Sequence, residues 1–283
     1  MRSPVLSRAA LCAAALMMAS PSMAQQTAQD QQVTSPSYAD LADVAAAAPI
    51  AADVRLRRAT RLRGELAAGV PPGMTRHLIE ADVLSLLRGA QGLPGRISWL
   101  YDLPDVAPNR PARIPRKARW LFLGDTVPGR PGQVRLAGPN ALIPWTAEMD
   151  QRLRALLVEL AAPNAAPPVT GVGNAFHVPG AIPGESETQI FLTTGDGRPV
   201  SLSILRRPGE QPRWAVALGE MVDDSAEPPQ PQTLLWYRLA CFLPRELPAG
   251  TTADMDEAAA AATREDYALV IAGLGACART PSG

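Results

Sequence analysis

The residues best suited to chemistry lie in one stretch, residues 173–187, that is rich in glycine and proline. It contains His177, Glu185 and Glu187. A histidine near two carboxylates can hold a divalent cation or act as an acid–base pair, and loops often carry such functional groups. We therefore take these three side chains as candidate ligand-binding residues. The alternative is a turn-rich connection whose polar side chains bond to backbone groups.

Elsewhere the sequence lacks the signatures of a catalytic centre. His77 and His177 are its two histidines, and without cysteine ligands they cannot assemble a zinc site. We expect His77 to lie at the surface or to be satisfied within the fold. Residues 184–188 approach the Gly-x-Ser-x-Gly nucleophile elbow, but the last glycine is missing and a strand, not a helix, is expected next. The sequence therefore predicts no catalytic residue and no cofactor.

Residues 1–24 have the pattern of a secretory signal peptide. A short basic start precedes an apolar core from about Ala9 to Met18, and the segment closes on a small-x-small ending. A retained membrane anchor would need about 20 uninterrupted apolar residues. A lipoprotein would need a small residue before the modified cysteine, whereas Leu11 precedes Cys12. We therefore expect a periplasmic or secreted protein with no transmembrane segment after cleavage.

Export determines how the cysteines are interpreted. Cys12 leaves with the signal peptide, so that Cys241 and Cys277 remain. An even pair in an oxidising compartment predicts one disulfide. The alternative is two free, buried thiols.

The charges divide the chain into two segments of opposite sign. Residues 51–145 hold 15 basic and 7 acidic side chains, whereas residues 146–283 hold 10 basic and 17 acidic ones. This division suggests two modules that attract one another or face different partners. The alternative is that arginines on solvated strands balance acidic loops. A nucleic-acid partner is not expected, because the compartment is wrong and no aromatic stripe accompanies the basic residues.

The first half predicts a small barrel. After a disordered leader over residues 25–36, the basic β-rich module of residues 37–145 begins with a short helix at Ser37. Five short strands follow, near residues 54–62, 75–87, 97–103, 118–123 and 133–136. In the first strand, alternation places Val54, Leu56, Arg58, Thr60 and Leu62 on one side. The module should resemble a five-stranded barrel.

The second half predicts an antiparallel meander. Residues 146–168 should form a helix, capped by Thr146, and a linker. Residues 169–283 then form an acidic module with strands near residues 188–194, 199–206, 213–218 and 234–243. The last run is apolar on both faces, which predicts a central strand. Two C-terminal helices, 252–262 and 265–274, should cover the sheet, so that the fold class is mostly β (α+β).

Two segments resemble a known group of proteins. Residues 171–194 and the run LLWYRLACFLP at 234–244 are similar to an uncharacterised family of secreted alphaproteobacterial proteins. The resemblance extends through most of the mature chain. It implies export and brings no activity with it.

These observations favour a cell-envelope binding or interaction protein over an enzyme. Its partner would be an unknown envelope protein or a small ligand. The alternative is a hydrolase-like periplasmic enzyme centred on His177, Glu185 and Glu187.

Overall fold

The computed structural model describes residues 35–108, 110–219 and 226–280 of the chain. The signal peptide predicted for residues 1–24, and nearly all of the leader predicted for residues 25–36, lie outside these ranges. Residues 36–283 are grouped in one compact unit, and the finer module boundaries stay a prediction.

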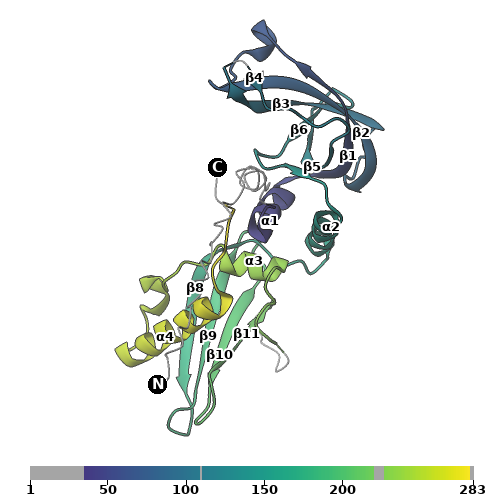
Figure 1. The fold of residues 1–283 in the computed structure, drawn as a ribbon. Coiled ribbons are helices and arrows are strands. Elements are labelled where there is room, and N and C mark those ends of the chain that lie inside the picture. The colour runs from purple at the N-terminus through teal and green to yellow at the C-terminus, as the bar shows by residue number, and fades with distance from the viewer. Residues whose placement is uncertain (1–34, 109, 220–225, 281–283) are drawn as a thin grey trace, which may run out of the picture. The chain divides into compact units, whose positions relative to one another are not determined.

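Within the described residues, the first sheet has seven antiparallel strands in the order β4-β3-β2-β1-β5-β6, with β7 paired to β5 (Figure 1). Strands occur at all five expected places, and β4 and β7 are short additions. A single 3₁₀ turn, η1 (Gly64–Ala67), separates β1 from β2. The strands are β1 (Ile50–Arg61), β2 (Met74–Arg88), β3 (Arg96–Ala107), β4 (Arg110–Pro111), β5 (Arg119–Thr126), β6 (Val134–Leu136) and β7 (Leu142–Pro144).

This sheet curls into a half-barrel around its own apolar core. At one end Ser98 on β3 bridges to Gln133, just before β6, and the Ser98 amide donates to the Gly132 carbonyl at 2.8 Å. Curling is helped by Gly124, where a Cβ would lie 2.1 Å from the Arg135 carbonyl oxygen. The enclosed residues are Ile50, Ala52, Val54, Leu56, Ile79, Ala81, Ile97, Trp99, Phe122 and Val134.

A β-bulge in β1 changes which of its side chains face the inside of the half-barrel. Leu56 pairs with Ala81, but Arg58 pairs with Glu80 and Ala59 with Ile79, so that Arg57 is an extra residue. One extra residue exchanges the two faces of a strand. The predicted alternation is therefore correct only as far as Leu56. Beyond the bulge, Ala59 takes the inner side in place of Arg58.

Two helices begin where the sequence predicts them. Helix α1 (Tyr38–Ala47) starts with a complete capping box between Ser37 and Asp40, and α2 (Ala147–Ala161) starts at Thr146, whose hydroxyl accepts from the Met149 amide. Both helices contribute apolar side chains to a second core, which also contains residues of β5 and of the C-terminal part of the chain.

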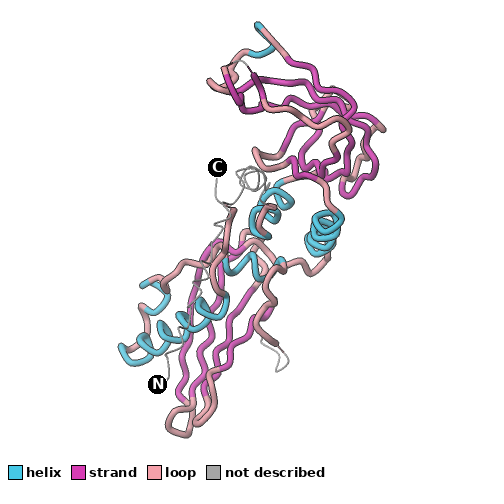
Figure 2. The backbone as a smooth tube through the Cα atoms, viewed as in Figure 1, coloured by secondary structure: helices cyan, strands magenta, loops and turns pink. Residues whose placement is uncertain are grey.

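The second sheet is antiparallel, in the order β11-β10-β9-β8 (Figure 2). Helix α4 (Glu257–Leu274) covers one face. It comes so close that a Cβ at Gly273 would lie 2.7 Å from Trp214 Nε1. The opposite face leaves Phe176 and Val178 exposed. The strands are β8 (Val169–Pro179), β9 (Ser186–Thr194), β10 (Val200–Arg206) and β11 (Arg213–Ala217).

The predicted strand at residues 234–243 is wrong. Residues Leu234–Ala240 form helix α3, which is capped by the Thr233 hydroxyl. A short apolar run cannot be assigned to helix or strand by periodicity alone. Here both sides of the run are apolar because α3 contacts three other helices. The two predicted C-terminal helices are a single helix, α4, which spans most of both ranges; the 3₁₀ turn η2 (Ala249–Thr252) precedes it.

The predicted disulfide between Cys241 and Cys277 is confirmed. It joins the end of α3 to the segment that follows α4, since the run that ends at Cys241 is a helix and not the predicted central strand. Beyond the bridge, the Thr280 amide donates to Asp40 at 2.8 Å, so that this segment is also held against α1. Among the described helices, none combines the length and the apolar character that crossing a membrane requires.

Breaking the disulfide should lower the melting temperature. A bridge across a loop of this length contributes about 3–4 kcal/mol, which corresponds to a shift on the order of 10 °C. Thermal unfolding with and without reductant measures it. The double variant C241S/C277S should melt at the lower temperature and be insensitive to reductant. Equal melting curves for the oxidised and reduced wild type would contradict the role of the bridge.

Candidate functional site

The structure does not bring the three candidate residues together. His177 lies on β8, which runs to Pro179, so the expected loop is a strand for half of its length. The register pairs His177 with Thr188 and Val178 with Glu187. Because neighbouring side chains on a strand point to opposite faces, Glu187 lies on the face away from His177. Glu185 closes the turn between β8 and β9, where its carbonyl accepts from the Gly180 amide at 2.7 Å.

His177 belongs instead to a buried polar network. Its Nδ1 lies 2.8 Å from Thr188 Oγ1, and the Thr188 hydroxyl donates to the Asp266 carboxylate. A hydroxyl has one proton, so His177 must be the donor in the first bond. Asp266 also accepts from Arg206 Nε at 2.6 Å. The network joins three strands, β8, β9 and β10, to α4.

This network has no access for a substrate. Thr188 on β9 and Asp266 on α4 are both 0% exposed, between the sheet and the helix. The Thr188 hydroxyl lies between a histidine and a carboxylate, as a catalytic nucleophile does, but it is not accessible to solvent. Within the described residues, no group of three His, Cys, Asp or Glu side chains is placed to hold a metal ion. We conclude that the network fastens α4 to the sheet.

A second group of polar side chains lies inside the half-barrel, where its apolar core ends. The strand register aligns Arg61 on β1 with His77 on β2, and His77 with Tyr101 on β3. The next row inward is Ala59, Ile79 and Trp99. Polar side chains therefore follow the apolar core on the inner face of these strands.

His77 is 8% exposed, and its Nδ1 lies 3.2 Å from the Thr75 carbonyl oxygen. A carbonyl oxygen only accepts, so Nδ1 carries the proton of this bond. Burial raises the pKa of the Tyr101 phenol above its ordinary value, which keeps that group neutral and able to donate.

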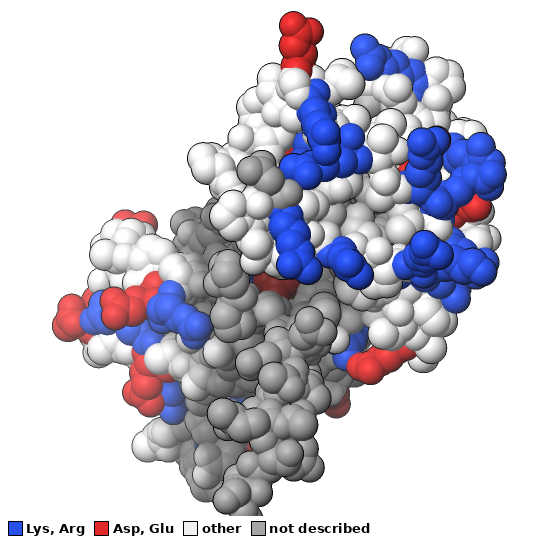
Figure 3. Space-filling model, turned by 45° about the horizontal axis from the view of Figure 1, so that its top comes forward, with Lys and Arg blue, Asp and Glu red and all other residues white. Residues whose placement is uncertain are grey.

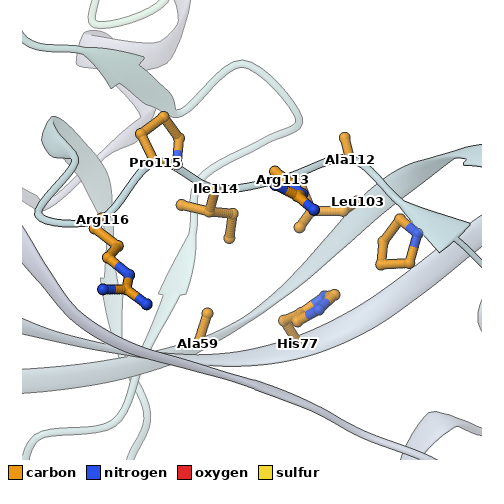
Figure 4. A pocket seen from close by; sticks show the side chains of 9 residues that line it. Ala59, His77, Leu103, Ala112, Arg113, Ile114, Pro115 and Arg116 are labelled. Carbon is orange, nitrogen blue, oxygen red and sulfur yellow. The ribbon is translucent and has the colours of Figure 1, made fainter.

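A pocket of about 510 Å³ opens next to this row. It is lined by Ala59, His77, Leu103 and residues 111–116, and we call this site the basic mouth. Figure 4 shows Ile114 and His77 extending into the space from opposite walls, with Arg116 extending toward Ala59. The pocket lies within the size range of ligand sites, about 300–1,000 Å³.

Backbone hydrogen bonds at both ends hold residues 111–116 over the pocket. The Ala112 amide donates to the Pro104 carbonyl at 2.8 Å. At the other end, the Ala118 amide donates to Pro115, and the Ala118 carbonyl accepts from the Leu56 amide at 2.7 Å. Leu56 is the last inward residue before the bulge. The part of β1 that binds residues 111–116 is therefore also the part where the two faces of the strand are exchanged.

Two exposed cations line the pocket without a carboxylate partner among the described residues. Arg113 and Arg116 are exposed, and neither forms an ion pair with any residue that the structure describes. Arg55 and Arg58 also lack an ion pair with a described residue, but they lie on the outer face of β1. In Figure 3, Lys and Arg side chains gather over the part of the molecule formed by the first sheet, with few acidic side chains among them.

Other arginines of the same sheet are neutralised. Arg119 binds the buried Asp53 through two hydrogen bonds of 2.8 and 2.5 Å. Arg76 binds Asp102 in the same manner, at 2.8 Å for each bond. The hydrogen bond from Arg76 lowers the pKa of Asp102 below its ordinary value. The cations of the basic mouth therefore differ from Arg76 and Arg119, each of which forms an ion pair that stabilises the sheet.

Sequence reasoning missed the basic mouth, although one signal was available. Thr75, His77, Ile79 and Ala81 alternate along β2, which places His77 on the face of two apolar residues and indicates that it points inward. Arg113 and Arg116 lie in a segment without periodicity, and nothing in the sequence indicates that it crosses a pocket.

No protein-family model matches the chain, and no curated protein matches it. The resemblance of residues 171–194 and 234–244 to a secreted family stays a prediction.

Removing the buried carboxylate of the second sheet should destabilise the protein. Asp266→Ala leaves Arg206 and Thr188 without their shared partner, and breaking a buried pair costs about 3 kcal/mol. Chemical denaturation measures the loss. Asp196→Ala, which breaks the exposed pair with Arg198, is the control and should change stability little. Equal effects of the two substitutions would rule out a fastening role for the network.

The Arg76–Asp102 pair should make stability depend on pH in the acid range. Because the pKa of Asp102 is lower in the folded state, the pair stabilises the fold above the unfolded-state value of about 3.9. This contribution is lost as the pH falls through the folded-state pKa. Urea denaturation between pH 6 and pH 2 should show a smaller acid loss for Asp102→Asn than for the wild type. Identical pH dependence in the two proteins would refute the linkage.

Proposed function

We propose that this chain is an exported binding protein of the cell envelope, and that its basic mouth binds an anionic ligand. The observation that carries the proposal is the pair Arg113 and Arg116, exposed at a pocket and without a carboxylate partner among the described residues. The signal-peptide pattern of residues 1–24 supports export.

The chemistry of the site suits a carboxylate or a phosphate. A guanidinium group presents planar donors that match such oxyanions, often through two parallel bonds. Arginines that stabilise this sheet are paired with carboxylates of the same sheet. Asp53 pairs with Arg119, and Asp102 pairs with Arg76. Arg113 and Arg116 have no such partner in the described part of the chain, so a ligand from outside can provide the negative charge.

The enzymatic alternative receives no support from the geometry. His177 and Glu187 lie on opposite faces of the second sheet, and the Thr188 hydroxyl is sealed beneath α4. The basic mouth is lined by histidine and arginine but by no carboxylate and no hydroxyl side chain. Such a lining suits binding better than hydrolysis.

Titration calorimetry with short-chain polyphosphate tests the proposal. The double variant R113Q/R116Q should bind at least about tenfold more weakly than the wild type, a loss of about 1.4 kcal/mol. The control R130Q/R135Q removes the same charge from the same sheet, away from the pocket lining, and should bind within about twofold of the wild type. Equal losses in the two variants would show that net charge alone attracts the anion.

A further inference from the structure

We infer that the ligand of the basic mouth is an anionic amphiphile, with a phosphate or carboxylate head and an apolar chain. This inference rests on the proposed function and adds the class of ligand. It follows from a lining that is mostly apolar and that also carries two cationic side chains.

Most of the pocket wall is apolar. Ala59 and Leu103 contribute from the strands, and Ile114 packs against the core of the half-barrel from the segment above. Two prolines and Ala112 complete that side. A small inorganic anion would leave this surface in contact with water. A hydrocarbon chain would cover it.

The charged side chains of the lining are exposed to solvent, where the head group of an amphiphile would lie. Arg113 and Arg116 are the exposed residues of the lining that carry charge. His77 uses Nδ1 for the Thr75 carbonyl, and its Nε2 forms no hydrogen bond with a described residue. A phosphate or carboxylate head could therefore bind a guanidinium group of this lining, while its chain covers the apolar side chain of Ile114.

Chain length provides the sharpest test. Each methylene group that enters an apolar site tightens binding by up to about fourfold. Titration calorimetry with ethyl, butyl, hexyl and octyl phosphate should show affinity rising about two- to fourfold per methylene. Octyl glucoside, with the same chain and a neutral head, should bind at least about tenfold more weakly than octyl phosphate. Equal affinities for ethyl and octyl phosphate would overturn the inference.

Two substitutions on β1 test whether the interior of the pocket contributes to binding. Ala59→Phe fills the space from the inner face of β1, and should abolish the gain in affinity with chain length. Thr60→Phe is the matched control, because its neighbouring position points to the other face of β1, and it should bind octyl phosphate like the wild type. Circular dichroism and melting curves establish that both variants fold.

The outcomes distinguish the two proposals. If Ala59→Phe binds octyl phosphate as the wild type does, the amphiphile inference is wrong. If polyphosphate binding still depends on Arg113 and Arg116 in that case, the proposed function stands. If polyphosphate binding is also insensitive to R113Q/R116Q, both fail. Vesicles of phosphatidylglycerol that bind as tightly as octyl phosphate, and equally well to Ala59→Phe, would show surface attraction and overturn the inference.

Discussion

The single extra residue in β1 is the constraint on which the candidate site depends. Before the bulge, the inner face of β1 is apolar and builds the core of the half-barrel. After it, the faces are exchanged, so that Ala59 faces inward and Arg61 aligns with His77. A regular strand would have placed Arg58 and Thr60 on the inner side instead. The bulge therefore ends the core and begins the pocket within three residues of Leu56.

The two sheets treat their buried polar groups differently. In the second sheet, Thr188, Asp266 and Arg206 satisfy one another beneath a helix, and the disulfide fixes the ends of the helices around them. In the first sheet, His77 has one ring nitrogen bonded to a carbonyl, and the nearby cations face solvent. A satisfied, closed network stabilises a fold, whereas an incomplete one at a pocket leaves bonds for a ligand. This contrast is why we place binding in the first sheet.

The sequence predicted those features that depend on local chemistry. The caps at Ser37 and Thr146, the hairpin around Gly195–Arg198 and the Cys241–Cys277 pair each follow from a few neighbouring residues or from cysteine counting. Features that depend on tertiary context were missed. The run from Leu234 is helical because three helices surround it, and neither the bulge after Leu56 nor the path of residues 111–116 has a local signature. The candidate site depends on the last two, so the sequence pointed to His177 and not to His77.

The most direct measurement is nuclear magnetic resonance of the two histidine rings while octyl phosphate is added. The chain has two histidines, and His77→Gln assigns their ring signals without ambiguity. We expect the ¹⁵N signals of the His77 ring to shift in a saturable manner, while those of His177 stay in place. Shifts confined to His177, or no shift at either ring while octyl phosphate binds, would contradict a ligand site in the basic mouth.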